Sequence, residues 1–278
     1  MWKVFLVLFL IQQGSPFHPV PSVVNPQTFF LPFNQSIPKE VMKAKEESLV
    51  AVEINIPKWN WDHNMTQEPG HGVGVTVWPN YVLMPLHLLG DYPSVWEGNN
   101  DFPTTITIFD GVRYFGASLV DYNYKMDLAI IKIKSPDSEG NTFRCKPIKR
   151  AQTTMLLDSN LSEPTMLYNK FFVFSFFASD PSIFFALELG PFRAITNNFD
   201  DGYLLDIPLG MVQGNLQPGF SGSPLFTPDG VLFGMIIRGK GNVFSFTVLP
   251  ETIENFLKAV AQRMGVDIDG HPLPMAAK

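Results

Sequence analysis

Three segments of the sequence carry residue types that act together in nucleophilic catalysis. His87 follows an apolar, strand-like run. Asp127 directly precedes the β-type run at residues 128–133. Ser221 lies in the turn-like segment 219–224, which begins Gly-Phe-Ser-Gly and precedes another β-type run. Each segment alone is common in loops, but a serine, a histidine and an aspartate in one site can activate a hydroxyl nucleophile.

The chemistry explains why these residue types belong together. A serine hydroxyl is a weak nucleophile, so a neighbouring base must accept its proton during attack. His87 would take the Ser221 proton and return it to the leaving group, while Asp127 would hold the ring in one tautomer and stabilise the imidazolium. The backbone N–H groups of Gly219 and Ser221 would face the developing oxyanion. Glycine suits that turn because it tolerates unusual backbone angles.

The elements that must position these residues are short strands. From about residue 47, runs of β-branched and aromatic residues are broken by Gly, Pro, Asn and Asp, which is typical of an all-β barrel or sandwich. One helix is predicted over 251–263, where apolar residues recur on one face. The predicted strands are 49–56, 73–77, 81–84, 104–109, 114–120, 128–133, 171–177, 183–188, 203–207, 231–237 and 243–248.

In the chain order His87, Asp127, Ser221, these segments resemble the trypsin-like (chymotrypsin-fold) serine peptidases. The likeness is greatest to the disulfide-free HtrA-like branch without a PDZ domain. That branch has Gly-X-Gly before the His strand, Asp-Leu-Ala before an apolar strand and Gly-Asn-Ser-Gly-Gly-Pro-Leu at the nucleophile. The resemblance covers roughly residues 47–261. It implies two six-stranded antiparallel β-barrels, at about 47–140 and 150–250, with the catalytic cleft between them and a C-terminal helix before a tail at 266–278.

The sequence departs from the family pattern at three places. Phe220 stands where digestive trypsins have Asp, so a newly released N-terminal amine would find no carboxylate to pair with, and activation by that route is not expected. Ser223 replaces the usual Gly, as it does in glutamyl endopeptidases. Residues 84–86 (Met-Pro-Leu) replace a small polar run before His87, and their bulk could alter the surroundings of that side chain.

By similarity, the base of a substrate pocket lies near Asn215, and one wall is formed by Ile237, Arg238 and Gly239. A neutral Asn215 argues against a preference for Lys or Arg, because a buried cation needs a paired carboxylate. Ile237 favours an apolar substrate side chain. Arg238 favours an acidic one if it points inward, and is otherwise a solvated hairpin residue.

Composition excludes several other classes. The 278 residues are 45% hydrophobic and 17% charged, which is enough to fill a large core. A net charge of −6 without a Lys/Arg block argues against nucleic acid as a partner. A single Cys excludes an intramolecular disulfide and a Cys-based metal centre. We therefore expect no metal or cofactor and, from the resemblance, a polypeptide substrate; the oligomeric state is left open.

The N-terminal residues predict export. Residues 4–11 are continuously apolar after one Lys, too short for a transmembrane helix, so residues 1–15 are predicted to be a signal peptide. The alternative is an apolar strand or helix of the mature fold. Residues 16–46, which begin with a Pro-rich stretch, predict an extended leader or pro-segment. A secreted or periplasmic protein without a membrane span is expected.

Three hypotheses of function follow. The first is a serine endopeptidase that acts through a Ser-His-Asp triad and an acyl-enzyme. The alternative is a catalytically inactive trypsin-like module that binds proteins, suggested by Phe220 and residues 84–85. A glycan- or lipid-binding β-sandwich would account for the many Phe residues but for none of the three motifs.

Overall fold

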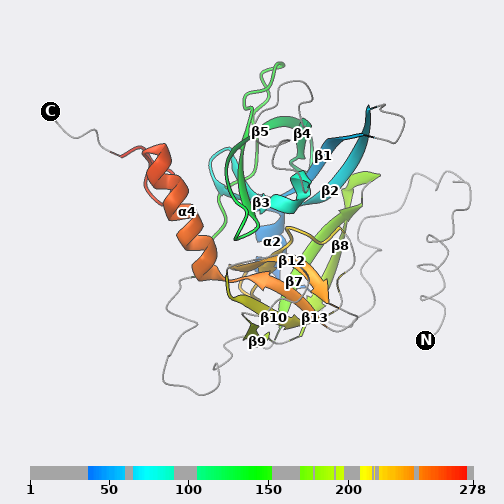
Figure 1. The fold of residues 1–278 in the computed structure, drawn as a ribbon, viewed down its shortest axis with the longest axis vertical. Coiled ribbons are helices and arrows are strands. Elements are labelled where there is room, and N and C mark those ends of the chain that lie inside the picture. Colours follow the sequence, from blue (N-terminus) through cyan, green and yellow to red (C-terminus); the bar gives the residue numbers. More distant parts are fainter. Residues whose placement is uncertain are drawn as a thin grey trace, which may run out of the picture.

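The structure is a computed structural model in which a β-barrel, a second β-sheet and the helices α2 and α4 are packed together (Figure 1). Elements are named by their labels in that figure. The structure describes residues 37–59, 65–90, 105–151, 170–177, 179–190, 192–196, 207–214, 216, 219–240 and 244–273. The predicted signal peptide at 1–15 and most of the predicted leader lie outside these residues.

Six antiparallel strands form a closed barrel in the first part of the chain. Because side chains alternate along a strand, Val50, Val52 and Ile54 of β1 lie on one face and are buried in the barrel interior. Closure leaves the barrel without an edge strand. The strands are β1 (Leu49–Trp59), β2 (Met65–Trp78), β3 (Tyr81–Pro85), β4 (Thr105–Phe109), β5 (Tyr114–Asn123) and β6 (Leu128–Ile133), paired in the order β1-β2-β3-β6-β5-β4.

The second part of the chain forms a seven-stranded sheet with the order β8-β7-β11-β12-β13-β10-β9. Its core is rich in phenylalanine, including Phe171, Phe192, Phe220 and Phe233. The strands are β7 (Phe171–Phe177), β8 (Asp180–Leu189), β9 (Phe192–Thr196), β10 (Leu209–Gln213), β11 (Pro224–Phe226), β12 (Leu232–Lys240) and β13 (Phe244–Val248).

The prediction of two six-stranded barrels is confirmed for the first barrel only. Closing a sheet requires its first and last strands to pair with each other. Within the described residues, β8 pairs with β7 and the five-residue β9 pairs with β10, so the second sheet stays open. The link between its two halves is also slight, because β11 joins β7 through one pair of residues, Phe226 and Phe172.

The strand predictions hold best where the apolar runs are long. The prediction at 203–207 lies outside the described residues except for Ile207. Strands β9, β10 and β11 were not predicted, because they are three to five residues long and β10 and β11 contain Gly or Pro.

The predicted C-terminal helix is confirmed as α4 (Pro250–Met264). Proline stands in its first turn, where a missing N–H costs nothing. Gly265 ends the helix in the left-handed conformation with φ 68°. None of the helices in the described part of the chain has the length and apolar character needed to cross a membrane.

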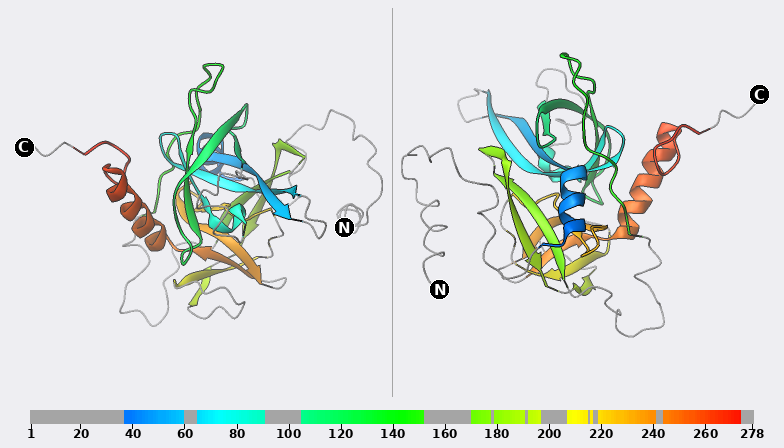
Figure 2. Two further views of the ribbon diagram at one scale, coloured as in Figure 1. Left: turned by 45° about the horizontal axis from the view of Figure 1, so that its top comes forward. Right: turned by 180° about the vertical axis from the view of Figure 1, so that it is seen from behind.

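A second helix, α2 (Lys39–Ser48), differs from the sequence prediction, which placed residues 39–46 in an extended leader. A ten-residue helix is marginal by itself, so tertiary contacts must stabilise it. Val41 is fully buried in the main core, and the Lys45 ammonium lies 3.7 Å from the centre of the Phe184 ring of β8. Burial lowers the pKa of Lys45. Seen from behind, α2 lies between the barrel and the second sheet (Figure 2).

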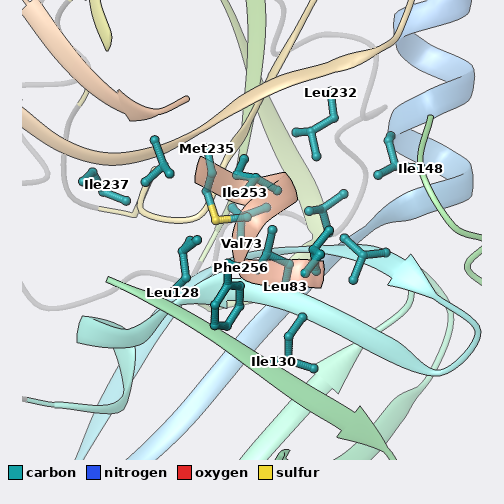
Figure 3. Packing of buried hydrophobic residues seen from close by; sticks show 14 of the residues in the cluster. Val73, Leu83, Leu128, Ile130, Ile148, Leu232, Met235, Ile237, Ile253 and Phe256 are labelled. Carbon is teal, nitrogen blue, oxygen red and sulfur yellow. The ribbon is translucent and has the colours of Figure 1, made fainter. Parts of the chain in front are cut away.

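The largest apolar cluster lies where the barrel, the second sheet and α4 meet (Figure 3). It joins the two β units into one packed body, so the loops at their junction are held in fixed relation. The labelled members are Val73, Leu83, Leu128 and Ile130 from the barrel, Ile148 from the connection, Leu232, Met235 and Ile237 from β12, and Ile253 and Phe256 from α4.

The single cysteine is buried in the core of the barrel and gives a test of the packing there. The Cys145 thiol lies 3.6 Å from the Leu49 carbonyl oxygen and 3.9 Å from that of Asp110. Burial, followed by the nearby Asp110 charge, raises its pKa to about 12 from 9.0. A raised native pKa means that the thiol's contribution to stability is complete below pH 9 and is lost as the pH rises toward 12.

We predict that native protein at pH 8 does not react with iodoacetamide over hours, whereas protein in guanidinium reacts within minutes. Mass spectrometry of Cys145 measures both rates. Rapid modification of the native protein would contradict the buried position.

Candidate active site

Strand pairing brings Asp127 and His87 together. β3 pairs with β6 so that Pro85 lies opposite Leu128. His87 belongs to the short 3-10 helix η2 (Leu86–Leu89), directly after β3, and Asp127 directly precedes β6. The two residues therefore leave the same end of one strand pair. The sequence prediction could only place each beside a strand, whereas the register makes them neighbours.

The Asp127 carboxylate contacts His87 at two points. Oδ1 accepts the backbone N–H of His87 at 2.8 Å, and Oδ2 lies 2.6 Å from Nδ1 of the ring. The Asp127 carbonyl oxygen also accepts the N–H of Leu86 at 3.1 Å. In a neutral ring, this contact assigns the proton to Nδ1 and leaves Nε2 as the acceptor.

Asp127 adopts a strained backbone conformation to make these contacts. Its φ of 53° lies in the left-handed region, which costs a non-glycine residue of order 1–3 kcal/mol. The Asp127 side chain is 8% exposed, whereas the His87 side chain is 25% exposed. The carboxylate is thus enclosed while the ring keeps an open edge, which suits an orienting acid and a reacting base.

The bulky residues before His87 do not crowd its ring. Met84 and Leu86 are buried in the barrel core. Pro85 faces the second sheet instead, because a methyl group placed on Gly222 would lie 2.8 Å from its Cδ atom. The bulky side chains of residues 84–86 are therefore accommodated by packing away from the His87 ring.

Ser221 lies on the other side of the junction, in a segment held by backbone hydrogen bonds. Its carbonyl oxygen accepts the N–H of Val73 in β2 at 2.9 Å. The Gly222 N–H donates to the Ile236 carbonyl oxygen at 2.8 Å, and the Ile236 N–H donates to that of Ser223 at 2.9 Å. The segment of Ser221 is thus fixed both to the barrel and to β12.

Two glycines allow this approach. A methyl group on Gly222, whose φ is +87°, would lie 1.8 Å from the Val73 carbonyl oxygen. A methyl group on Gly72 would lie 3.0 Å from the Ser221 carbonyl oxygen and 2.4 Å from the side chain of Leu88, the residue after His87. Both the His87 turn and the Ser221 segment therefore lie against Gly72. The backbone of Ser221 and the turn that holds His87 and its partner Asp127 therefore meet at Gly72, at the junction of the two β units.

Phe220 replaces an acidic residue for a reason of packing. Its side chain is 8% exposed and belongs to the apolar core of the second sheet. A carboxylate there would be surrounded by apolar side chains and would have to be paired.

The sequence did not single out Ser175, although its signal is visible: it is the one polar residue in the apolar strand β7. Its Oγ donates to the carbonyl oxygen of Gly219 at 2.6 Å. Ser223 Oγ donates in turn to the carbonyl oxygen of Phe174, the residue before Ser175. The expected oxyanion segment is therefore tied to β7 from both sides.

Three of the four predicted pocket residues lie within the described part of the chain. Asn215 lies outside the described residues. Ile237 is buried in the junction core, whereas Arg238 is half-buried and Gly239 is exposed on β12. A methyl group on Gly239 would lie 3.2 Å from the Leu216 carbonyl oxygen. Among the described side chains, no three of His, Cys, Asp or Glu are grouped closely enough to hold a metal ion.

Comparison with known proteins identifies the fold. No family model and no curated protein matches the sequence. The chain is similar to the crystal structure of the Rv3671c protease from M. tuberculosis in its active form, at 17% identity and a TM-score of 0.57, over 95% of this chain and 98% of that one. It is also similar to Rv3671c from M. tuberculosis H37Rv as an inactive-form Ser-to-Ala mutant, at 15% identity and a TM-score of 0.55, over 83% and 94% of the two chains. The chain thus has the fold of the trypsin-like serine proteases.

We predict that Gly222→Ala lowers the free energy of unfolding by about 3 kcal/mol or more, since it combines an unfavourable φ with a backbone clash. Gly111→Ala is the matched control, because Gly111 has φ +90° but no atom within 4 Å of the added methyl. Its cost should be about 1–2 kcal/mol, from the backbone alone. Guanidinium unfolding of both variants measures the difference, and equal losses would contradict the close approach to Val73.

Proposed function

We propose that this chain is a serine endopeptidase that hydrolyses peptide bonds through a Ser-His-Asp triad and an acyl-enzyme. The observation that carries the proposal is the two-point contact between Asp127 and His87, at 2.8 and 2.6 Å. That contact orients the His87 ring, and the segment of Ser221 is bound to the same barrel through the Val73 N–H. The shared fold with the Rv3671c protease supports the same reaction class.

In the proposed mechanism, Nε2 of His87 takes the proton of Ser221 as its oxygen attacks the peptide carbonyl. Asp127 keeps Nδ1 protonated and stabilises the imidazolium that forms. The N–H groups of Gly219 and Ser221 bind the oxyanion, and one such donor typically contributes about 100- to 1,000-fold in rate. His87 then protonates the leaving amine, and water hydrolyses the acyl-enzyme by the same steps.

The proposed substrate is a polypeptide whose side chain meets Arg238, Gly239 and Asn215. A neutral Asn215 disfavours a Lys or Arg side chain there, since a buried cation needs a paired carboxylate. Arg238, if it points inward, would favour an acidic side chain. Cleavage of a peptide library by the purified chain distinguishes acidic from apolar preference.

The lack of a disulfide supports placement with the HtrA-like branch, and the apolar N-terminus supports export to the periplasm or cell exterior. The alternative of an inactive binding module was motivated by Phe220 and residues 84–85. Phe220 and Met84 are core residues, so neither argues against catalysis.

We predict that a fluorophosphonate probe labels the intact chain on Ser221. Ser221→Ala should abolish labelling, and His87→Ala should slow it by at least about 1,000-fold, because the hydroxyl loses its base. Labelling is followed by mass spectrometry, with circular dichroism to show that each variant is folded. A folded wild-type chain that never labels would favour the binding module.

We further predict that Asp127→Asn lowers kcat by about 10⁴-fold while KM changes little. An amide preserves the shape but can donate to Nδ1, which favours the tautomer with the proton on Nε2, where it cannot act as a base. Steady-state kinetics on a substrate from the library measure this. A loss below tenfold would mean that Asp127 only holds the η2 turn in place.

A further inference from the structure

Two serine hydroxyls form a crossed pair of hydrogen bonds between β7 and the segment of Ser221. Ser175 of β7 donates to the carbonyl oxygen of Gly219 at 2.6 Å, and Ser223 donates to the carbonyl oxygen of Phe174. Ser175 is 3% exposed and Ser223 is fully buried. We call Ser175 and Ser223 the hydroxyl clasp.

The clasp is placed in apolar surroundings. β7 reads Phe-Phe-Val-Phe-Ser-Phe-Phe, and Ser175 is flanked by Phe174 and Phe176. Burying a hydroxyl without a partner costs about 1–3 kcal/mol, so each serine is tolerated there only while its hydrogen bond is made. Breaking either hydrogen bond would leave a buried hydroxyl without a partner. A clasp with only one of its two hydrogen bonds is therefore disfavoured.

The bonds of this segment set the direction of one expected oxyanion donor. The C=O and N–H of a trans peptide point in opposite directions. The Phe220 carbonyl oxygen accepts the backbone N–H of Ser223 at 2.9 Å. The Ser221 N–H belongs to that same peptide, so it points away from Ser223. The direction of the Ser221 N–H therefore depends on the position of Ser223. The hydrogen bond from the Ser223 hydroxyl to the Phe174 carbonyl oxygen fixes that position.

Ser175 restrains the peptide that links the two donors. Gly219 has φ +100°, a region open to glycine, and lacks a side chain to limit rotation. Of the described atoms, Ser175 Oγ is the one within 4 Å of a methyl group placed on Gly219, at 3.4 Å. Phe220, which follows, adds apolar packing. The hydrogen bond from the Ser175 hydroxyl to the Gly219 carbonyl oxygen therefore restrains the backbone at a residue whose own side chain cannot do so.

We propose that Ser175 and Ser223 are positioning residues that hold the oxyanion donors of Gly219 and Ser221 in their working orientation. The inference rests on the proposed peptidase function. The inference extends that function by assigning roles to Ser175 of β7 and to Ser223, which replaces the family's glycine. Neither hydroxyl touches the reacting atoms, and both act through the backbone of residues 219–221.

The test measures kcat, KM and the affinity for a peptide aldehyde, whose hemiacetal oxygen on Ser221 occupies the oxyanion position. Ser175→Ala and Ser223→Ala should each lower kcat by about 10- to 100-fold, less than the loss of a whole donor, with KM within twofold. Aldehyde affinity should fall by the same factor as kcat. Ser175→Thr and Ser223→Thr, which keep the hydroxyl, should restore most of the activity and serve if an alanine variant fails to fold.

Thr227→Val is the matched control, because Thr227 is fully buried and its hydroxyl bonds to Val231 in a turn away from the site. It should lower Tm much as Ser175→Ala does but leave kcat unchanged. Equal kcat losses in both variants, or clasp variants that keep kcat within twofold of an active wild type, would overturn the clasp while the peptidase function stands. A folded wild type that neither labels nor turns over substrate would overturn both.

Discussion

The close approach of the Ser221 segment to β2 is the constraint on which the rest of the site depends. His87 and Asp127 belong to the barrel and Ser221 to the second sheet, so no site exists unless these two units meet at a fixed distance. Gly222 lets the backbones touch, and the Val73 N–H bonds to the Ser221 carbonyl oxygen at 2.9 Å. The apolar cluster beneath, with Met235 and Phe256, keeps this approach in place.

Without a disulfide, the junction is held by packing and by buried hydrogen bonds. Helix α2 reinforces it, since Val41 enters the shared core and Lys45 lies over Phe184 of the second sheet. Residues 39–48 therefore pack as part of the shared core. The strain at Asp127 is accepted in this setting because its carbonyl and carboxylate groups are both bound by residues 86–87.

The departures from the family pattern become understandable from their surroundings. Met84 and Phe220 fill the cores of the barrel and of the second sheet. Ser223 bonds to β7 where the family has a glycine. Met84 and Phe220 looked from the sequence like reasons to doubt catalysis, because a one-dimensional pattern does not show which way a side chain points. In the structure, all three support the loops that they border.

The sequence by itself determined the residue types of the site, their order, the long strands of the barrel and the C-terminal helix, since local periodicity and turn residues encode these features. Tertiary structure alone decided the register that joins Asp127 to His87, the helix at 39–48, the open second sheet and the role of Ser175. These depend on contacts between residues far apart in the chain, such as Ser175 with Gly219. Such contacts arise from packing and from the need to satisfy buried polar groups with hydrogen bonds. Neither is visible in the order of residues along the chain.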